Sequence, residues 1–257
     1  MNIPPLSAKK SLGQHFLSDE NMCRKIVDEV MKNPMDQLLE VGPGAGALTK
    51  YFLELKKMSF KAVELDEEKI RFLNEAFPQA RGSFIHEDFL NMGIPFQGKF
   101  DIVGNFPYNI SSQILFKILS WKEHVRLVTG MFQKEVAQRI AAGPGNKVYG
   151  VLTVLVQVFF DVEYLFEVHE KCFTPPPKVK SAVLRLRPKS SAPGFRTEKD
   201  FFLLVKTAFN QRRKTLRNAV RNLFDPSILQ DHIFDRRAEQ LTIAEFAGLT
   251  HKMNESE

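Results

Sequence analysis

The chain has 257 residues, of which 44% are hydrophobic, and a formal net charge of +6 at pH 7. This length and composition are those of a globular protein with one large or two smaller domains, and they exclude a disordered chain. No apolar run is long enough to span a bilayer, and the first ten residues lack the apolar core of a signal peptide. Two cysteines, Cys23 and Cys172, are too few for a disulfide framework. We therefore expect a soluble, cytoplasmic protein with free thiols.

The positive charge is concentrated in one segment. Residues 178–224 contain 13 Lys and Arg against two Asp and Glu, whereas the rest of the chain has a net charge of −5. A basic segment on an otherwise acidic protein is typical of proteins that bind a polyanion. Nucleic acid fits better than a membrane because no amphipathic anchor is evident. The alternative is a solvated charged surface without a partner.

The first predicted helix begins near Ser18 or Asp19, either of which can cap it, and Pro34 ends it. Its apolar residues recur at helical spacing: Cys23, Ile26, Val27 and Val30. The segment before this helix, residues 10–17, is too short to form a helix of its own. It could fold over a site, but its composition favours a disordered basic arm.

A glycine turn follows the first predicted strand, residues 37–41. Gly42 and Gly44 lie between this strand and a helix, so the backbone can come close to a ligand at the helix N-terminus. The second strand, residues 60–63, ends at Glu64, where a carboxylate is placed to bind ribose hydroxyls. This pattern predicts a nucleotide-type cofactor, and the glycine spacing alone does not exclude NAD.

The third predicted strand, residues 83–85, leads to Asp88. This carboxylate could accept a hydrogen bond from an adenine amine, or it could cap the following turn. Each of the predicted strands therefore delivers a glycine or a polar side chain at its carboxyl end. In a doubly wound sheet these ends meet at one edge, which is where such sheets bind nucleotides.

The fourth predicted strand, residues 100–104, runs into Asn105, Phe106, Pro107 and Tyr108. The proline fixes its own φ and keeps the preceding residue out of the helical region, so Asn105 and Tyr108 are presented at the strand end. The Asn105 amide oxygen and the Phe106 carbonyl can accept both hydrogens of an exocyclic amine, while Tyr108 stacks on the ring that carries it. This arrangement suits an adenine or cytosine flipped out of its stack. The alternative is an ordinary strand-to-helix turn with a half-buried tyrosine.

The second half of the chain predicts two further strands, residues 126–131 and 181–186. Residues 151–160 are apolar without alternation, which fits either a buried helix or a strand. The linker composition of residues 190–194 predicts a domain boundary. Beyond it, residues 216–224 predict a helix with one apolar and one basic face. The six histidines show no paired spacing, so we expect no metal site.

Several motifs together closely resemble the ribosomal RNA adenine N6,N6-dimethyltransferase family. They occur in order over nearly the whole chain: Gln14-His15-Phe16-Leu17, Glu40 to Gly46, Glu64-Leu65-Asp66, Asp88, Asn105 to Ser111, Phe173 to Val179 and Phe209 to Asn218. The resemblance implies a Rossmann-like, doubly wound α/β sheet in a catalytic domain of residues 1–189 that binds S-adenosylmethionine. It further implies a smaller, all-helical RNA-binding domain of residues 190–257. One departure is visible, because the family usually has leucine where this chain has Phe106.

The resemblance also implies roles for individual residues. It makes the N-terminal segment part of the cofactor site, which then comprises Gln14, His15, Leu17, Gly42, Gly44, Glu64, Leu65, Asp88, Phe89 and Asn105. The implied catalytic residues are Asn105, Phe106, Pro107 and Tyr108, with Phe173 as a second aromatic wall for the target base. Without the resemblance, Phe173 is as readily explained as a core anchor. The residues expected to bind RNA are Arg212, Arg213, Lys214, Arg217 and Arg221.

We therefore expect a monomeric enzyme that forms N6,N6-dimethyladenosine at two adjacent adenosines near the 3′ end of small-subunit ribosomal RNA. Its partner is the assembling small subunit, and neither metal nor membrane is required. Three alternatives stay open: a large-subunit RNA adenine methyltransferase of the antibiotic-resistance type, a catalytically idle RNA-binding assembly factor and a nucleotide-dependent oxidoreductase. Residues 209–218 resemble the small-subunit enzymes better than the large-subunit ones.

Overall fold

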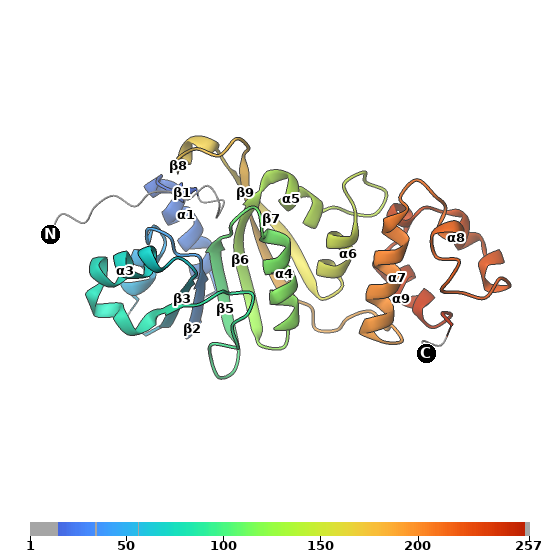
Figure 1. Cartoon of the computed structure of the whole chain (residues 1–257), viewed down its shortest axis with the longest axis horizontal. Coiled ribbons are helices and arrows are strands. Elements are labelled where there is room, and N and C mark those ends of the chain that lie inside the picture. The colour runs from blue at the N-terminus through green and yellow to red at the C-terminus, as the bar shows by residue number, and fades with distance from the viewer. Residues whose placement is uncertain (1–14, 34, 56, 255–257) are drawn as a thin grey trace. The chain divides into compact units, whose positions relative to one another are not determined.

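The computed structural model describes residues 15–33, 35–55 and 57–254, so the predicted cofactor contact of Gln14 lies outside the described residues. A seven-stranded sheet has the order β4-β3-β2-β5-β6-β9-β7, and a separate ladder joins β1 to β8 (Figure 1). The strands are β1 (Phe16–Leu17), β2 (Gln37–Val41), β3 (Ser59–Glu64), β4 (Phe84–His86), β5 (Phe100–Asn105), β6 (Val125–Gln133), β7 (Phe160–Val168), β8 (Phe173–Thr174) and β9 (Ser181–Pro188). The helices are α1 (Glu20–Met31), α2 (Thr49–Leu53), α3 (Glu67–Ala76), α4 (Ser111–Ser120), α5 (Lys134–Ile140), α6 (Val151–Gln157), α7 (Glu198–Asn210), α8 (Leu216–Ala219) and α9 (Ile243–Thr250).

The sheet is parallel over most of its width. Strand β2 pairs in parallel with β3 on one side and with β5 on the other, and β3–β4 and β5–β6 are parallel as well. Strand β9 runs antiparallel to β6. Because the strand order reverses between β2 and β5, the carboxyl ends of these two strands flank the crevice where such sheets bind ligands. The predicted doubly wound α/β sheet is confirmed.

The local sequence explains the elements that lead to the carboxyl ends of β2 and β5. Strands β2 and β5 are buried along almost their whole length, as expected for central parallel strands covered on both faces. Helix α1 begins where Asp19 accepts a hydrogen bond from Met22 N at 2.9 Å, which identifies Asp19 as the cap. Its predicted apolar stripe is confirmed, since Cys23, Ile26, Val27 and Val30 are all buried.

Two predictions about individual elements need correction or completion. Residues 151–160 form a helix, α6, and then begin strand β7, because a bend near Val158 divides the apolar run. The helix predicted over residues 216–224 is only α8, Leu216–Ala219, since the backbone leaves the helical conformation at Val220, with φ −112° and ψ 16°. Strand β7 and the ladder between β1 and β8 were not predicted.

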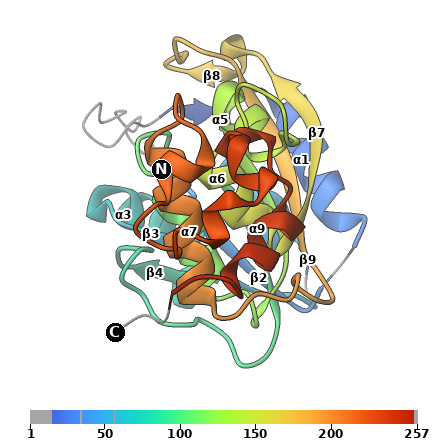
Figure 2. The same cartoon turned by 90° about the vertical axis from the view of Figure 1, so that its right-hand side faces the viewer.

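The chain divides into two compact units. The first comprises Met1–Ala137 with Val162–Pro188, and the second comprises Gln138–Asp161 with Lys189–Glu257. Within residues 189–254 the structure contains helices and 3₁₀ turns, with α7 and α9 side by side in both views (Figures 1 and 2). The second unit also takes residues 138–161, which the sequence assigned to the catalytic domain. None of the described helices is long and apolar enough to cross a membrane.

Candidate functional site

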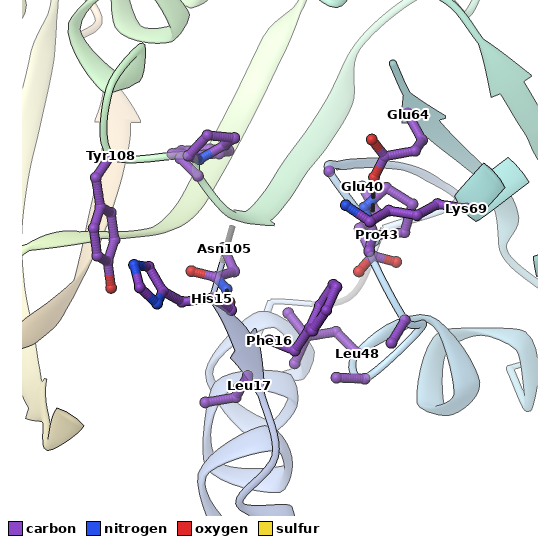
Figure 3. Close-up of a pocket in the computed structure, with 16 residues that line it drawn as sticks. His15, Phe16, Leu17, Glu40, Pro43, Leu48, Glu64, Lys69, Asn105 and Tyr108 are labelled. Atoms are coloured by element: carbon purple, nitrogen blue, oxygen red, sulfur yellow. Dashed lines mark hydrogen bonds between the residues drawn. The ribbon is translucent and has the colours of Figure 1, made fainter. Parts of the chain in front are cut away.

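A pocket lies at the carboxyl ends of β2, β3 and β5, inside the first unit (Figure 3). Figure 3 shows Tyr108, His15 and Asn105 on one side of it and Glu64, Glu40 and Lys69 on the other. The lining residues are His15, Phe16, Leu17, Glu40, Gly42, Pro43, Gly44, Ala45, Ala47, Leu48, Glu64, Lys69, Asn105, Phe106, Pro107 and Tyr108. The structure therefore brings together most of the cofactor-binding and catalytic residues that the sequence predicted.

The glycine turn after β2 forms the floor of this pocket. Gly42 and Gly44 have φ values of 71° and 57°, a left-handed conformation that favours glycine over residues with a side chain. A Cβ atom at Gly44 would lie 3.3 Å from the Phe16 ring, so a side chain there would crowd the pocket. The turn exposes its backbone to a ligand because it has no side chains at these positions.

A buried carboxylate, Glu64, stands at the tip of β3. Its Oε2 accepts a hydrogen bond from Gly44 N at 3.2 Å, and its Oε1 accepts one from Asp66 N at 3.1 Å. These two bonds fix the carboxylate at the pocket wall, and each oxygen keeps a second lone pair for a ligand hydroxyl.

Glu40 and Lys69 are pocket residues that the sequence analysis did not identify as site residues. Burial raises the pKa of Glu40 to about 8, although the Thr49 hydroxyl donates a hydrogen bond to Glu40 Oε2 at 2.7 Å. Lys69 is 1% exposed, with Nζ 3.7 Å from Asp66 Oδ2 and 5.1 Å from the centroid of the Phe16 ring. A charge inside the apolar strand Gln37–Val41 was the only sequence sign of Glu40, and Lys69 gave none because its helix position is otherwise ordinary.

The N-terminal strand β1 closes the pocket from one side. Phe16 pairs with Thr174 and Leu17 pairs with Phe173. The carbonyl of Pro175 can only accept, so His15 Nδ1 donates to it, at 2.9 Å. Residues 15–17 are thus an ordered wall of the pocket, and the disordered arm that composition favoured is wrong for these residues.

Residues 105–108, which follow Gly104, line the opposite side of the pocket. Asn105 Nδ2 donates to the His15 carbonyl at 2.9 Å, and the His15 and Tyr108 rings stack with centroids 5.7 Å apart and planes 28° apart. The Tyr108 hydroxyl is hydrogen-bonded to Ser181 Oγ, and burial raises the pKa of Tyr108. Phe106 is among the lining residues, and its side chain is fully buried.

Four of the predicted residues do not line this pocket. Asp88 accepts hydrogen bonds from Leu90 N and Asn91 Nδ2, both at 2.9 Å, and so caps its own turn. Phe89 is buried with its ring edge-on to Trp121 at 5.3 Å. Leu65 is 52% exposed just beyond Glu64. Phe173 is 2% exposed in the hydrophobic core, the position of the core anchor that the sequence left as an alternative.

The five predicted RNA-binding residues lie in the second unit and differ in their contacts. Arg212 donates to the carbonyls of Lys147 at 2.7 Å and Tyr149 at 3.2 Å, and Arg217 pairs with Asp235 at 2.9 Å. Lys214 and Arg221 are exposed and line a polar hollow. The remaining lining residues of this hollow are Gln211, Asn218, Ala219 and Asn222. Arg213 is exposed beside it. Across the described residues, no group of three or more His, Cys, Asp or Glu could hold a metal ion.

A family model described as ribosomal RNA adenine dimethylase matches residues 6–254. The chain is 49% identical over 253 residues to the ribosomal RNA small subunit methyltransferase A of Cytophaga hutchinsonii, with 97% of this chain and 98% of that protein covered. It is 50% identical over 250 residues to the protein of the same name from Phocaeicola vulgatus, with 95% and 89% covered.

Solved structures share the fold of this chain. A dimethyladenosine transferase from Plasmodium falciparum matches with a TM-score of 0.77 and 25% identity, covering 90% of this chain and 94% of that one. The 23S rRNA methyltransferase ErmE matches with a TM-score of 0.67 and 24% identity, covering 91% and 99%, which shows a shared fold. Given the family match over nearly its whole length and its identity to curated relatives, the chain belongs to the ribosomal RNA adenine dimethylase family.

Proposed function

We propose that this protein transfers methyl groups from S-adenosylmethionine to N6 of adenosines in small-subunit ribosomal RNA, giving N6,N6-dimethyladenosine. The observation that carries this proposal is the orientation of the Asn105 amide. Because its Nδ2 donates to the His15 carbonyl, Oδ1 is left as an acceptor at the pocket, next to the Phe106 backbone. Family membership supports the reaction, and the names of the near-full-length relatives support the small-subunit substrate.

The pocket residues fit S-adenosylmethionine. The Glu64 carboxylate is fixed by two backbone N–H groups and can accept hydrogen bonds from the two ribose hydroxyls. The open backbone of Gly42 and Gly44 allows close approach of the ligand. When bound, the cofactor supplies a methyl group that is attached to a positively charged sulfur. The sulfur is an excellent leaving group because it departs as a neutral thioether.

The adenine end of the cofactor is expected to contact two residues that are not part of the pocket lining, Leu65 and Asp88. Leu65 follows β3 and Asp88 follows β4, and these strands are neighbours, with Glu64 paired to His86. An exposed leucine can cover one face of an adenine ring, and the Asp88 carboxylate can accept from its amine while it caps the turn.

The target base is held by the residues at the end of β5. Asn105 Oδ1 and the Phe106 carbonyl accept hydrogen bonds from the adenine N6 amine, while Tyr108 stacks on the base. The nitrogen lone pair is delocalised into the ring, so these two acceptors favour a pyramidal nitrogen aimed at the methyl group. N6 would form a bond to the methyl carbon as the bond from that carbon to sulfur breaks, and N6 would then lose one proton to solvent water. Positioning carries most of the work, and no general base is needed in this set of residues.

The experiment is a methyl-transfer assay on purified protein with labelled cofactor and small-subunit ribosomal RNA in assembling particles, followed by nucleoside mass spectrometry. Dimethyladenosine at two adjacent positions near the 3′ end is the expected product. Monomethyladenosine alone at full conversion contradicts dimethylation. Normal RNA binding without transfer indicates an assembly factor, and methylation of large-subunit RNA alone indicates the antibiotic-resistance type. The large-subunit, antibiotic-resistance type is not favoured by the relatives, because their names specify the small subunit.

We propose that the polar hollow of the second unit binds phosphates of this RNA. Two cations, Lys214 and Arg221, flank amide side chains there, and phosphate contacts fix the register of a nucleic acid without reading its bases. Arg213, next to Lys214 in the sequence, is exposed as well. Arg212 already donates to backbone carbonyls, and Arg217 already pairs with a carboxylate of the protein. These two arginines therefore stabilise the fold around the hollow and also add positive charge.

Replacing both Lys214 and Arg221 with glutamine is expected to weaken RNA binding about tenfold at physiological salt and to lower the slope of log affinity against log salt by about 1 to 2. The unfolding temperature should not change, because both side chains are exposed. Titrations of RNA at several salt concentrations measure this. Lys252→Gln is the control, since it removes one exposed charge of the same unit, paired with Asp231, and Lys252 does not line the hollow. An equal loss in the control contradicts a phosphate site at the hollow.

A further inference from the structure

Two glycines lie side by side beneath the ring of Phe106. Gly104 on β5 and Gly130 on β6 are direct partners in the parallel pairing of these strands. A Cβ atom at Gly104 would lie 2.7 Å from Phe106 Cε1, and one at Gly130 would lie 2.4 Å from Phe106 Cε2. The ring therefore spans both glycines, with one edge over each.

The remaining sides of this slot are closed. The Phe132 ring meets the Phe106 ring edge-on, with centroids 5.1 Å apart, and Phe106 is 0% exposed. The Phe106 N–H donates to the Met131 carbonyl at 3.2 Å, which ties the turn to β6. A close-packed ring of this kind has no room to move unless its own backbone moves with it.

We propose that Gly130 is a positioning residue for methyl transfer: the space it leaves seats the Phe106 ring and thereby fixes the Phe106 carbonyl and the Asn105 amide that precedes it. This inference rests on the proposed function, in which those two groups hold the target amine. Any side chain at position 130 displaces the Phe106 ring. The displaced ring shifts the Phe106 backbone, and the Phe106 carbonyl and Asn105 Oδ1 then no longer lie where they accept from the target amine. Gly130 itself does not line the pocket, so it acts through the rings above it: Phe106, the nearer, and Phe132, whose Cε2 would lie 2.9 Å from the same Cβ atom.

The test is a double-mutant cycle of Gly130→Ala and Phe106→Leu, read as kcat at saturating cofactor and RNA. Gly130→Ala alone is expected to lower kcat at least about tenfold, since misplacement by a fraction of an ångström at the acceptors is amplified in the rate. Phe106→Leu removes Phe106 Cε2, the atom nearest to the new methyl group at 2.4 Å, and leaves Phe132 Cε2 at 2.9 Å. Adding Gly130→Ala in that background should therefore lower kcat much less than it does in the wild type, and the double variant should exceed Gly130→Ala at least about fivefold.

Gly104 offers a matched control on the neighbouring strand. A Cβ atom there would lie 2.5 Å from the Val41 carbonyl oxygen as well as near the Phe106 ring. The backbone clash persists whatever residue stands at position 106. Phe106→Leu should therefore fail to rescue Gly104→Ala, whereas it should rescue Gly130→Ala.

The positioning role predicts a change in kcat of the folded protein, with RNA affinity held and with more monomethylated product. Gly130→Ala that lowers kcat by the same factor in both backgrounds overturns the proposal. So does a lower unfolding temperature with unchanged kcat per folded molecule. If Gly130→Ala alone does not fold, the comparison of Phe106→Leu with the double variant decides, because a kcat in the double variant about tenfold or more below that of Phe106→Leu contradicts the slot. Absence of transfer by the wild type would instead refute the proposed function.

Discussion

Asn105→Ala is expected to lower methyl transfer about a thousandfold, with RNA affinity within about twofold of the wild type. The substitution removes the Oδ1 acceptor for the target amine and the Nδ2 donor to the His15 carbonyl, so it loosens both the base and the N-terminal wall. RNA affinity is expected to persist because the proposed phosphate contacts lie at the hollow of the second unit. Single-turnover rates with labelled cofactor, together with RNA titrations, measure the two quantities.

Asn74→Ala is the matched control for this result. Asn74 lies on α3, and its side chain donates to the Ile70 carbonyl of the same helix at 2.9 Å. It should keep wild-type transfer and RNA binding. Equal losses of transfer and RNA affinity in Asn105→Ala would mean that the residue maintains the fold and does not hold the base.

Glu40→Gln is expected to remove most of the pH dependence of stability between pH 5 and 9. Burial raises the pKa of Glu40 from 4.5 to about 8, so the folded protein keeps a proton that the unfolded chain releases. Unfolding therefore releases a proton in this window, and the free energy of unfolding falls as pH rises from 4.5 to about 8. Full deprotonation costs at most ~5 kcal/mol. Glutamine is neutral at every pH and its carbonyl can still accept from Thr49.

Urea unfolding of the cofactor-free protein at pH 5, 7 and 9 measures this effect. The variant should match the wild type near pH 5 and exceed its stability at pH 9. Glu67→Gln is the control, because Glu67 is exposed and its loose pair with Arg71 spans 3.8 Å. Parallel pH profiles for the wild type and Glu40→Gln would show that Glu40 is ionised in the folded protein.

The sheet could be predicted because its signals are local. Apolar runs such as residues 37–41 and 100–104 end in glycine or polar residues, and a central parallel strand carries both features within a few residues. The ladder between β1 and β8 could not be predicted in this way. Each strand has two residues, too few for a periodic pattern, and the partners lie more than 150 residues apart.

The site shows the same division. Asn105 and Tyr108 were identified because proline fixes the backbone next to them, and Glu64 because it ends a strand. Lys69 was missed since burial of a lysine depends on neighbours that are distant in the sequence, here the Phe16 ring, as well as on local ones such as Asp66, the cap of its own helix. Asp88 illustrates the limit of composition, because the same carboxylate serves as a turn cap whether or not it also binds a ligand.

The ladder between β1 and β8 also bears on how the enzyme is made. Translation produces Phe16 and Leu17 at the start, yet Phe173 and Thr174 leave the exit tunnel only after most of the first unit has been synthesised. Until then, β1 of the nascent chain has no β8 to pair with, and one side of the pocket proposed for the methyl donor is incomplete. Catalytic competence is expected to arise late and in one step, when the emerging second strand captures the waiting first one.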